Sequence, residues 1–226
     1  MEITTRSGSL VVIAEDGRVD IEVDGLQEQA KRKQVWRESG RLHIRSGSGS
    51  NSLTVKCPPG TDLGAGSDSG SVELRGDFGD VKLKSSSSAI SVESARSAEV
   101  KSRDGKITIA RTHGRASAGT VSGSIEVEHA RSARAATVSG KIKMRRIVGS
   151  AEAMSVSGKI DIASEGAGDI SAATVSGAIK VRIPKHRAPE VKCRRKSGSL
   201  DVDCTEGSDL KITVATVSGA IKVGTH

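Results

Sequence analysis

Aromatic side chains are almost missing from this sequence: Trp36 and Phe78 are present, and tyrosine is absent. Hydrophobic residues make up only 35% of the 226 residues, which argues against an ordinary globular core rich in large side chains. Two alternatives remain, a disordered chain or a thin core of small β-branched side chains. Disordered chains show no hydrophobic period. Valine and isoleucine recur here at fixed spacing, which favours the thin core.

Long apolar runs are missing as well. No stretch approaches the roughly 20 apolar residues that a membrane-spanning helix needs, so no transmembrane segment is predicted. Residues 1–9 hold no basic segment followed by an apolar one, so no signal peptide is visible. The sequence as written predicts a cytoplasmic location. A location at the cell surface stays open if the natural chain begins further upstream.

Cysteine is rare too, and Cys57, Cys193 and Cys204 form no C-x-x-C pair. This argues against a disulfide-rich secreted scaffold and against a metal or redox centre. Each cysteine follows apolar residues at period 2, so we expect three small buried side chains. A disulfide between Cys193 and Cys204 is the alternative. No cofactor is predicted, because the sequence has no P-loop or dinucleotide-binding fingerprint.

What the sequence does contain is an internal repeat. A hydroxyl residue, a valine, a serine and a glycine are followed by alternating apolar residues at 120–127, 137–144, 155–162, 174–181 and 216–223. The first apolar residue after the glycine recurs every 17 to 21 positions over nine copies. These nine positions are Val72, Ile90, Ile107, Ile125, Ile142, Ile160, Ile179, Leu200 and Ile221.

Each repeat predicts two short strands joined by a bend at the Ser-Gly pair, because alternation at period 2 fits strands and excludes helices. One unit cannot bury its own apolar face, whereas stacked units can. We therefore predict an all-β fold, a single-stranded parallel β-solenoid of about nine coils. A right-handed coil is favoured, since the left-handed hexapeptide type needs an apolar residue at every sixth position.

An outward-facing file of charges supports this register. It reads Glu126, Lys143, Asp161, Lys180, Asp201 and Lys222 in chain order. If coils stack in chain order, each charge lies beside opposite charges on both sides, which stabilises the stack.

The two ends of the chain are expected to differ. Residues 1–60 are strand-like but off the repeat, and we predict an amino-terminal β cap continuous with the solenoid of residues 61–226. Within the cap, 34–37 and 41–45 predict a hairpin turning at 38–40, and Trp36 is the expected plug of the core. No cap is visible after Val223. The carboxyl-terminal edge is therefore expected to pair with a protein partner or with another copy of the chain.

The copies Thr-Val-Ser-Gly-Ala-Ile-Lys-Val at 174–181 and 216–223, and the segment 181–191, resemble a bacterial family. It is the β-strand-repeat domain of unknown function also labelled putative adhesin. The resemblance covers most of the chain, including the amino-terminal hairpins and the strand end at Pro58-Pro59-Gly60. It implies a parallel β-solenoid with no catalytic residues to carry over.

The sequence predicts a non-catalytic structural or interaction scaffold. The alternative is binding of an acidic polymer (a glycan, an anionic lipid surface or a nucleic acid), since the net charge of +8 is unevenly placed. A carbohydrate-active solenoid enzyme ranks last, because the return segments, the polar stretches that connect one repeat to the next, are too short to build an obvious cleft. The ordinary interpretation of the basic residues is a solvated face. The candidate polyanion site consists of Lys180, Arg182, Lys185, Arg187, Lys192, Arg194, Arg195 and Lys196.

Overall fold

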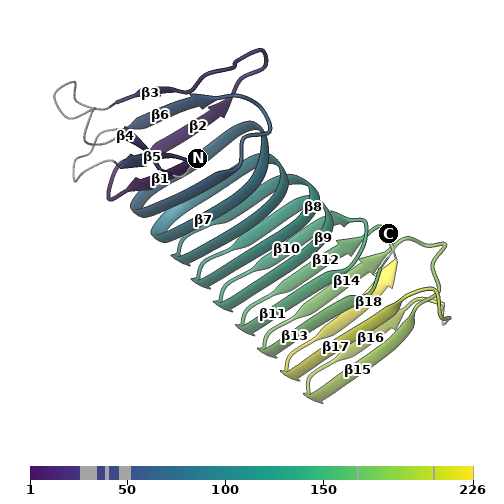
Figure 1. Cartoon of the computed structure of the whole chain (residues 1–226). Helices are drawn as coiled ribbons and strands as arrows, with labels where there is room; N and C mark the ends of the chain where they lie inside the picture. The colour runs from purple at the N-terminus through teal and green to yellow at the C-terminus, as the bar shows by residue number, and fades with distance from the viewer. Residues whose placement is uncertain (26–34, 39–40, 46–51, 167, 206, 226) are drawn as a thin grey trace.

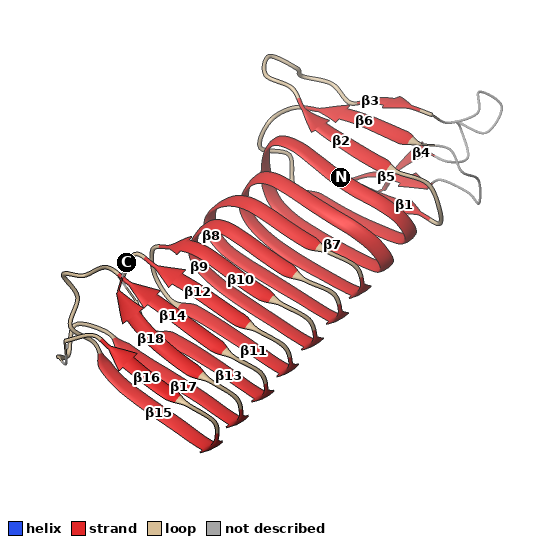
Figure 2. Cartoon of the chain, turned by 180° about the vertical axis from the view of Figure 1, so that it is seen from behind, coloured by secondary structure: helices blue, strands red, loops and turns tan. Residues whose placement is uncertain are grey.

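The computed structural model describes residues 1–25, 35–38, 41–45, 52–166, 168–205 and 207–225. These residues contain strands and turns but no helix, and hence no helix that could cross a membrane. Figures 1 and 2 show a rod in which coils made of strands are stacked one on another along its length. The strands are β1 (Glu2–Thr5), β2 (Leu10–Ala14), β3 (Glu22–Asp24), β4 (Val35–Glu38), β5 (Arg41–Arg45), β6 (Leu53–Cys57), β7 (Leu63–Asp104), β8 (Ile107–Ser122), β9 (Ile125–Ser139), β10 (Ile142–Ile147), β11 (Ala151–Ser157), β12 (Ile160–Ser164), β13 (Ile170–Ser176), β14 (Ile179–Ile183), β15 (Glu190–Ser197), β16 (Leu200–Asp203), β17 (Lys211–Ser218) and β18 (Ile221–Thr225).

The predicted parallel β-solenoid is confirmed. Ile125 pairs in parallel with Ile142, and Ile142 with Ile160, so equivalent residues of successive repeats lie in adjacent layers. All three side chains are buried. The core is thin, as predicted: each layer contributes a few aliphatic residues and small alanines, and the file continues through the whole rod.

The bends depend on glycine. Gly140 has φ +150°, and a Cβ added to it would collide with the carbonyl oxygen of Gly123 in the layer above. The same contact repeats between Gly158 and Gly140 and between Gly177 and Gly158. Layers spaced about 4.8 Å apart leave no room for a side chain at this corner.

The carboxyl-terminal coils do not stack in chain order, which corrects our prediction for that end. Ile179 of β14 pairs with Ile221 of β18, and Ile221 pairs in turn with Leu200 of β16. The last coil, β17–β18, therefore lies between β13–β14 and β15–β16. The free end of the rod is formed by β15 and β16, as Figure 2 shows, and not by the carboxyl-terminal strand.

The layer swap also changes the charge file. Glu126 pairs with Lys143, Lys143 with Asp161, and Asp161 with Lys180, as expected. Lys180 then lies beside Lys222, so the predicted alternation fails there. It resumes at the end of the rod, where Lys222 Nζ forms an ion pair with Asp201 at 2.7 Å.

The amino-terminal end is interleaved in the same way. Ile3 of β1 pairs with Ala65 of β7 on one side and with Ile44 of β5 on the other. Leu10 of β2 likewise lies between Val72 and Leu53. Strands β1 and β2 thus form one further layer next to β7, and β5 and β6 form a second layer outside it.

Two antiparallel strands run along the outer layer formed by β5 and β6. β3 pairs with β6, and β4 pairs with β5, which confirms the pairing of the predicted hairpin; its residues 34, 39 and 40 lie outside the described residues. Trp36 does not plug the core. Its side chain is 37% exposed and stacks on His43, with the Arg45 guanidinium 5.7 Å from the ring. Position 36 lies on the antiparallel strand β4, outside the coil, where a large ring has no layer to fill.

Candidate functional site

The eight basic residues predicted as one site lie on different parts of the rod. Lys180 and Arg182 belong to β14, while Lys185 and Arg187 lie in the segment that follows it. The other four, Lys192, Arg194, Arg195 and Lys196, lie on β15 at the free end. Because β14 and β15 follow opposite sides of the bend and another coil intervenes, the structure forms two smaller groups.

Some of these cations already have acidic partners. Arg182 contacts the Asp161 carboxylate at 2.7 Å, and Lys192 contacts Glu190 at 2.8 Å. Glu190 consequently has a lowered pKa, caused first by its hydrogen bond to Lys192. Arg195 donates to the carbonyl oxygen of Gly198 at the bend. Arg194 and Lys196 point outward and have no ion pair among the described residues, so they remain available to an external anion.

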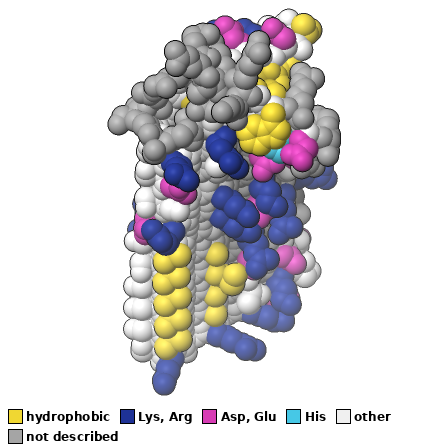
Figure 3. All heavy atoms as spheres, turned by 60° about the vertical axis from the view of Figure 1, so that its left-hand side comes forward, with side chains coloured by type: hydrophobic (Ala, Val, Ile, Leu, Met, Phe, Trp, Pro, Cys, Tyr) yellow, Lys and Arg dark blue, Asp and Glu magenta, His cyan; other side chains and the backbone are white. Residues whose placement is uncertain are grey.

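A surface that the sequence interpretation overlooked lies just before the bends. Val121, Val138, Val156, Val175 and Val217 occupy equivalent positions in five adjacent layers, each between two in-register pairs of hydroxyl residues. Each valine is between 45% and 49% exposed. Figure 3 shows them as a continuous line of hydrophobic side chains. We call this file the valine ladder.

A second apolar file runs beside the valine ladder. It lies two residues earlier on the same strands, about 7 Å away. The file consists of Ala136, Met154, Ala173 and Ala215, and Met154 is 39% exposed. The signal for both files was present in the repeat: Val121 directly follows the inward-facing Thr120, so period 2 places it outside.

Between the two files, each strand has one residue that points inward and carries a hydroxyl group. Thr120, Thr137, Ser155, Thr174 and Thr216 point inward and are at most 7% exposed. Thr174 Oγ1 donates to the carbonyl of Ser176 at 3.4 Å, and Ser102 Oγ donates to that of Asp104 at 2.9 Å. These bonds fix the strand just before the bend in those two coils, whereas the hydroxyls of Thr137, Ser155 and Thr216 have no hydrogen-bond partner among the described residues.

Two connected depressions follow the files. One, of about 440 Å³, begins at Lys101 and Ser102 of β7 and continues over β8, β9 and β11 to Val156. The other, of about 470 Å³, continues over β13, β15 and β17 and ends at Arg194, Arg195 and Lys196. Met154 and Ser155 line both. Together they form a long, shallow and mostly apolar trough along the rod.

The end of the trough opposite Arg194 and Lys196 carries neutralised cations. Lys101 extends the alanine file and contacts Glu99 at 2.6 Å, while Arg103 extends the valine ladder and contacts Asp104 at 3.2 Å. Lys101 holds the pKa of Glu99 below its usual range. The trough is therefore apolar in the middle and cationic at the β15 end.

A polar hollow of about 630 Å³ lies on the return side of the coils. His113, Glu128 and His129 are among the residues that line it. Glu93 in this hollow accepts a hydrogen bond from the backbone nitrogen of Gly76 at 2.9 Å, so it serves the local fold. The described residues contain no group of three or more side chains suited to hold a metal ion.

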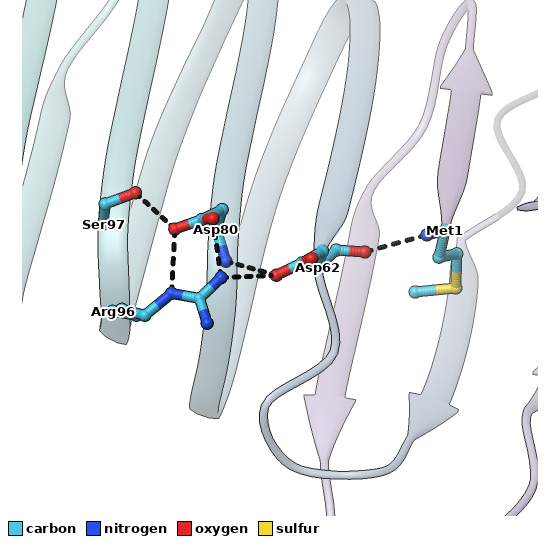
Figure 4. A network of polar contacts seen from close by, with 5 residues as sticks. All are labelled: Met1, Asp62, Asp80, Arg96 and Ser97. Atoms are coloured by element: carbon cyan, nitrogen blue, oxygen red, sulfur yellow. Dashed lines mark hydrogen bonds and ion pairs between the residues drawn. The ribbon is translucent and has the colours of Figure 1, made fainter.

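An ionic network ties the amino-terminal layers together on the same side (Figure 4). Arg96 donates to both carboxylate oxygens of Asp80, at 3.1 and 2.6 Å, and reaches Asp62 at 3.2 Å. The terminal amino group of Met1 donates to the carbonyl of Asp62 at 2.8 Å. The Arg96 bonds, followed by one from Ser97, lower the pKa of Asp80 to about 2. This network joins successive coils and is structural.

The three cysteines form no disulfide with one another, so the alternative of a Cys193–Cys204 disulfide is not found. Cys57 is buried as expected, and desolvation raises the pKa of its thiol. Cys193 and Cys204 are only partly buried, because they lie in the last layer of the rod. Burial also raises the pKa of Cys193, so the thiol form prevails at neutral pH.

Comparisons with known proteins were made once this geometry was clear. A family model described as Toastrack DUF4097 matches residues 1–225. No curated protein matches. Three solved structures are similar over nearly the whole chain: a putative adhesin from Bacteroides fragilis (13% identity, 98% of this chain and 91% of that one, TM-score 0.35), a putative adhesin from Parabacteroides distasonis (9%, 98% and 91%, 0.42) and a putative cell adhesion protein from Clostridium sporogenes (10%, 100% and 92%, 0.24).

Proposed function

The chain belongs to the Toastrack DUF4097 family, and we propose that it is a non-catalytic scaffold that binds a protein partner along its valine ladder. The carrying observation is the file of five valines, each nearly half exposed in consecutive layers. Single exposed apolar residues are ordinary, whereas a contiguous apolar patch with a polar rim is typical of an interaction site.

The dimensions of the trough favour an amphipathic helix as the bound element. Four steps between the five valines, at about 4.8 Å each, give an apolar length of about 19 Å. A helix of about 13 residues has this length, and its apolar stripe can cover two files about 7 Å apart. Arg194 and Lys196 at one end favour acidic residues at the matching end of the helix.

A synthetic helical peptide tests the proposal. It carries leucines on one face and glutamates at the end that meets β15; a scrambled peptide of equal composition is the control. Fluorescence anisotropy should detect binding of the first peptide only. Binding should be lost in a Val138→Thr/Val156→Thr/Val175→Thr variant, which keeps the side-chain shape and replaces one methyl group of each valine by a hydroxyl.

The conservative changes Ser91→Thr and Thr108→Ser, at outward positions beyond the bend, provide the matched control and should leave peptide binding intact. Equal binding to the wild type and to the triple valine variant would contradict the proposal. A circular dichroism melt of each variant separates loss of binding from loss of fold.

The second candidate function is binding of an acidic polymer at the β15 end, the smaller form of the predicted basic site. The supporting observation is that Arg194, Arg195 and Lys196 are consecutive and exposed. Heparin serves as the probe. Binding should weaken steeply with salt and disappear in an Arg194→Glu/Arg195→Glu/Lys196→Glu variant. Binding that does not change with salt would contradict this candidate.

A further inference from the structure

The layer formed by β15 and β16 has a neighbour on one side only among the described residues. β15 pairs with β17, and β16 pairs with β18. Leu200 and Val202 take the inward positions that Ile221 and Val223 occupy in the next layer, yet each is 41% exposed. The equivalent Ile221 and Val223 are buried. A further layer would cover Leu200 and Val202 and pair the free backbone groups of both strands.

The two strands of this layer carry opposite charges on their outward side. Lys192, Arg194 and Lys196 alternate along β15, whereas Asp201 and Asp203 alternate along β16. β15 runs toward the bend at 198–199, and β16 runs away from it. A twofold axis through this bend would lay β15 of one copy antiparallel to β16 of the other.

We propose that two copies of this chain join end to end through this layer, with β15 antiparallel to β16 of the second copy. Centring the axis between Gly198 and Ser199 puts Lys196 opposite Asp201 and Arg194 opposite Asp203 of the second copy. Outward residues then meet outward residues, so both strands keep their parity. The axis doubles every contact, which gives four ion pairs of complementary sign.

The charge pattern also excludes the competing arrangement. Pairing β15 with its own copy would bring Lys192, Arg194 and Lys196 against the same three cations, and like charges directly opposite oppose pairing. Arg195 takes the inward position where other layers carry a hydroxyl, but its guanidinium is bonded to Gly198 at the bend. Leu200 and Val202 therefore remain open to the second copy. The cations of β15 oppose the pairing of this strand with β15 of another copy.

Charge reversal at one predicted pair tests the arrangement on the full chain. Arg194 and Asp203 are suited to it, because Asp201 already pairs with Lys222 within the chain. Sedimentation equilibrium should show a dimer for the wild type. Arg194→Glu alone and Asp203→Lys alone should each weaken it at least about tenfold, since each replaces two attractions by two repulsions. The double variant Arg194→Glu/Asp203→Lys should restore the dimer.

Lys185→Glu is the matched control: it makes the same change of charge at an exposed position outside β15 and β16 and should leave the dimer unchanged. A monomeric wild type at millimolar concentration would overturn the proposal, and so would a double variant as weak as the two single ones. The double variant also separates dimer formation from heparin binding at Arg194. It should restore the dimer, whereas heparin binding should stay weakened because Arg194 is still absent. No valine of the ladder takes part in this dimer, although the dimer uses Arg194 and Lys196, which also line the end of the trough.

Discussion

Ile179 lies directly beside Ile221, although Leu200 follows Ile179 first along the chain. The backbone nitrogen of Ile179 donates to the carbonyl of Ala220 at 2.8 Å, and that of Ile221 donates to Ser199 at 2.9 Å. The carboxyl-terminal coil is therefore held on both sides. β1 and β2 are enclosed in the same way at the other end, so neither terminal strand is the edge at which stacked coils ordinarily fray.

This order of layers predicts which amides lose protection when the last coil is removed. In a chain ending at residue 209, the Ile179 amide loses its acceptor, whereas the Ile160 amide still donates to Ala178. Hydrogen exchange measured by NMR should show Ile179 exchanging rapidly and Ile160 remaining protected. Continued protection of Ile179 would mean that Leu200 had taken the place of Ile221, and would contradict the interleaved order.

The sequence predicted the stacked files but could not predict their order at the ends. Ile125, Ile142 and Ile160 recur at nearly constant spacing, and parallel layers leave one register that buries all three. The steps from Ile179 to Leu200 and from Leu200 to Ile221 are equal, so periodicity does not distinguish the two orders. The available signal was Arg195, which replaces an inward hydroxyl and fits only a layer with one free side.

The candidate surfaces were predictable to different degrees. Parity alone placed Val121 and its equivalents outside, so the valine ladder could have been found from the sequence. The division of the basic residues could not, because it depends on which coil lies between Arg182 and Arg194. Trp36 was misplaced because its size suggested a core position, although the hairpin predicted from the sequence already put it on an antiparallel strand. The handedness of the coil stays a prediction.

Two valines of one coil should differ sharply in their effect on stability. Val181 is buried and Val175 is 49% exposed, although they lie six residues apart. Val181→Ala should lower the free energy of unfolding by about 2 kcal/mol, because it leaves a cavity in a thin core. Val175→Ala should change it by about 0.5 kcal/mol. Urea unfolding measures both, and equal effects would contradict the assignment of Val175 to the surface.

The corner glycines predict a second contrast. Gly140→Ala forces a left-handed conformation on alanine and places its Cβ against the Gly123 carbonyl, so we expect a loss of more than about 2 kcal/mol. Gly17 also has positive φ, +77°, but an added Cβ would meet nothing within 4 Å. Gly17→Ala should therefore cost only the conformational term of about 1 kcal/mol. Thermal unfolding of the two variants compares them directly; a Gly140→Ala protein as stable as Gly17→Ala would show that the layers can separate at the corner.

The ionic network at Asp80 predicts how stability depends on acidity. Its pKa of about 2 lies below the ordinary 3.8, because Arg96 and then Ser97 bond to the carboxylate. A carboxyl whose pKa is lowered by folding stabilises the protein above its unfolded value, and this stabilisation is lost as the pH falls from about 4 to about 2. The difference in stability between the wild type and Asp80→Asn should therefore be constant near neutral pH and vanish over that acidic window.

Carboxyl NMR titration should find the Asp80 pKa near 2 in the wild type and closer to 3.8 in Arg96→Gln, with a smaller rise in Ser97→Ala. Arg75→Gln, which removes the partner of Glu73 and leaves Asp80 untouched, is the control. An Asp80 that titrates normally in the wild type would mean that Arg96 does not hold these layers together in solution.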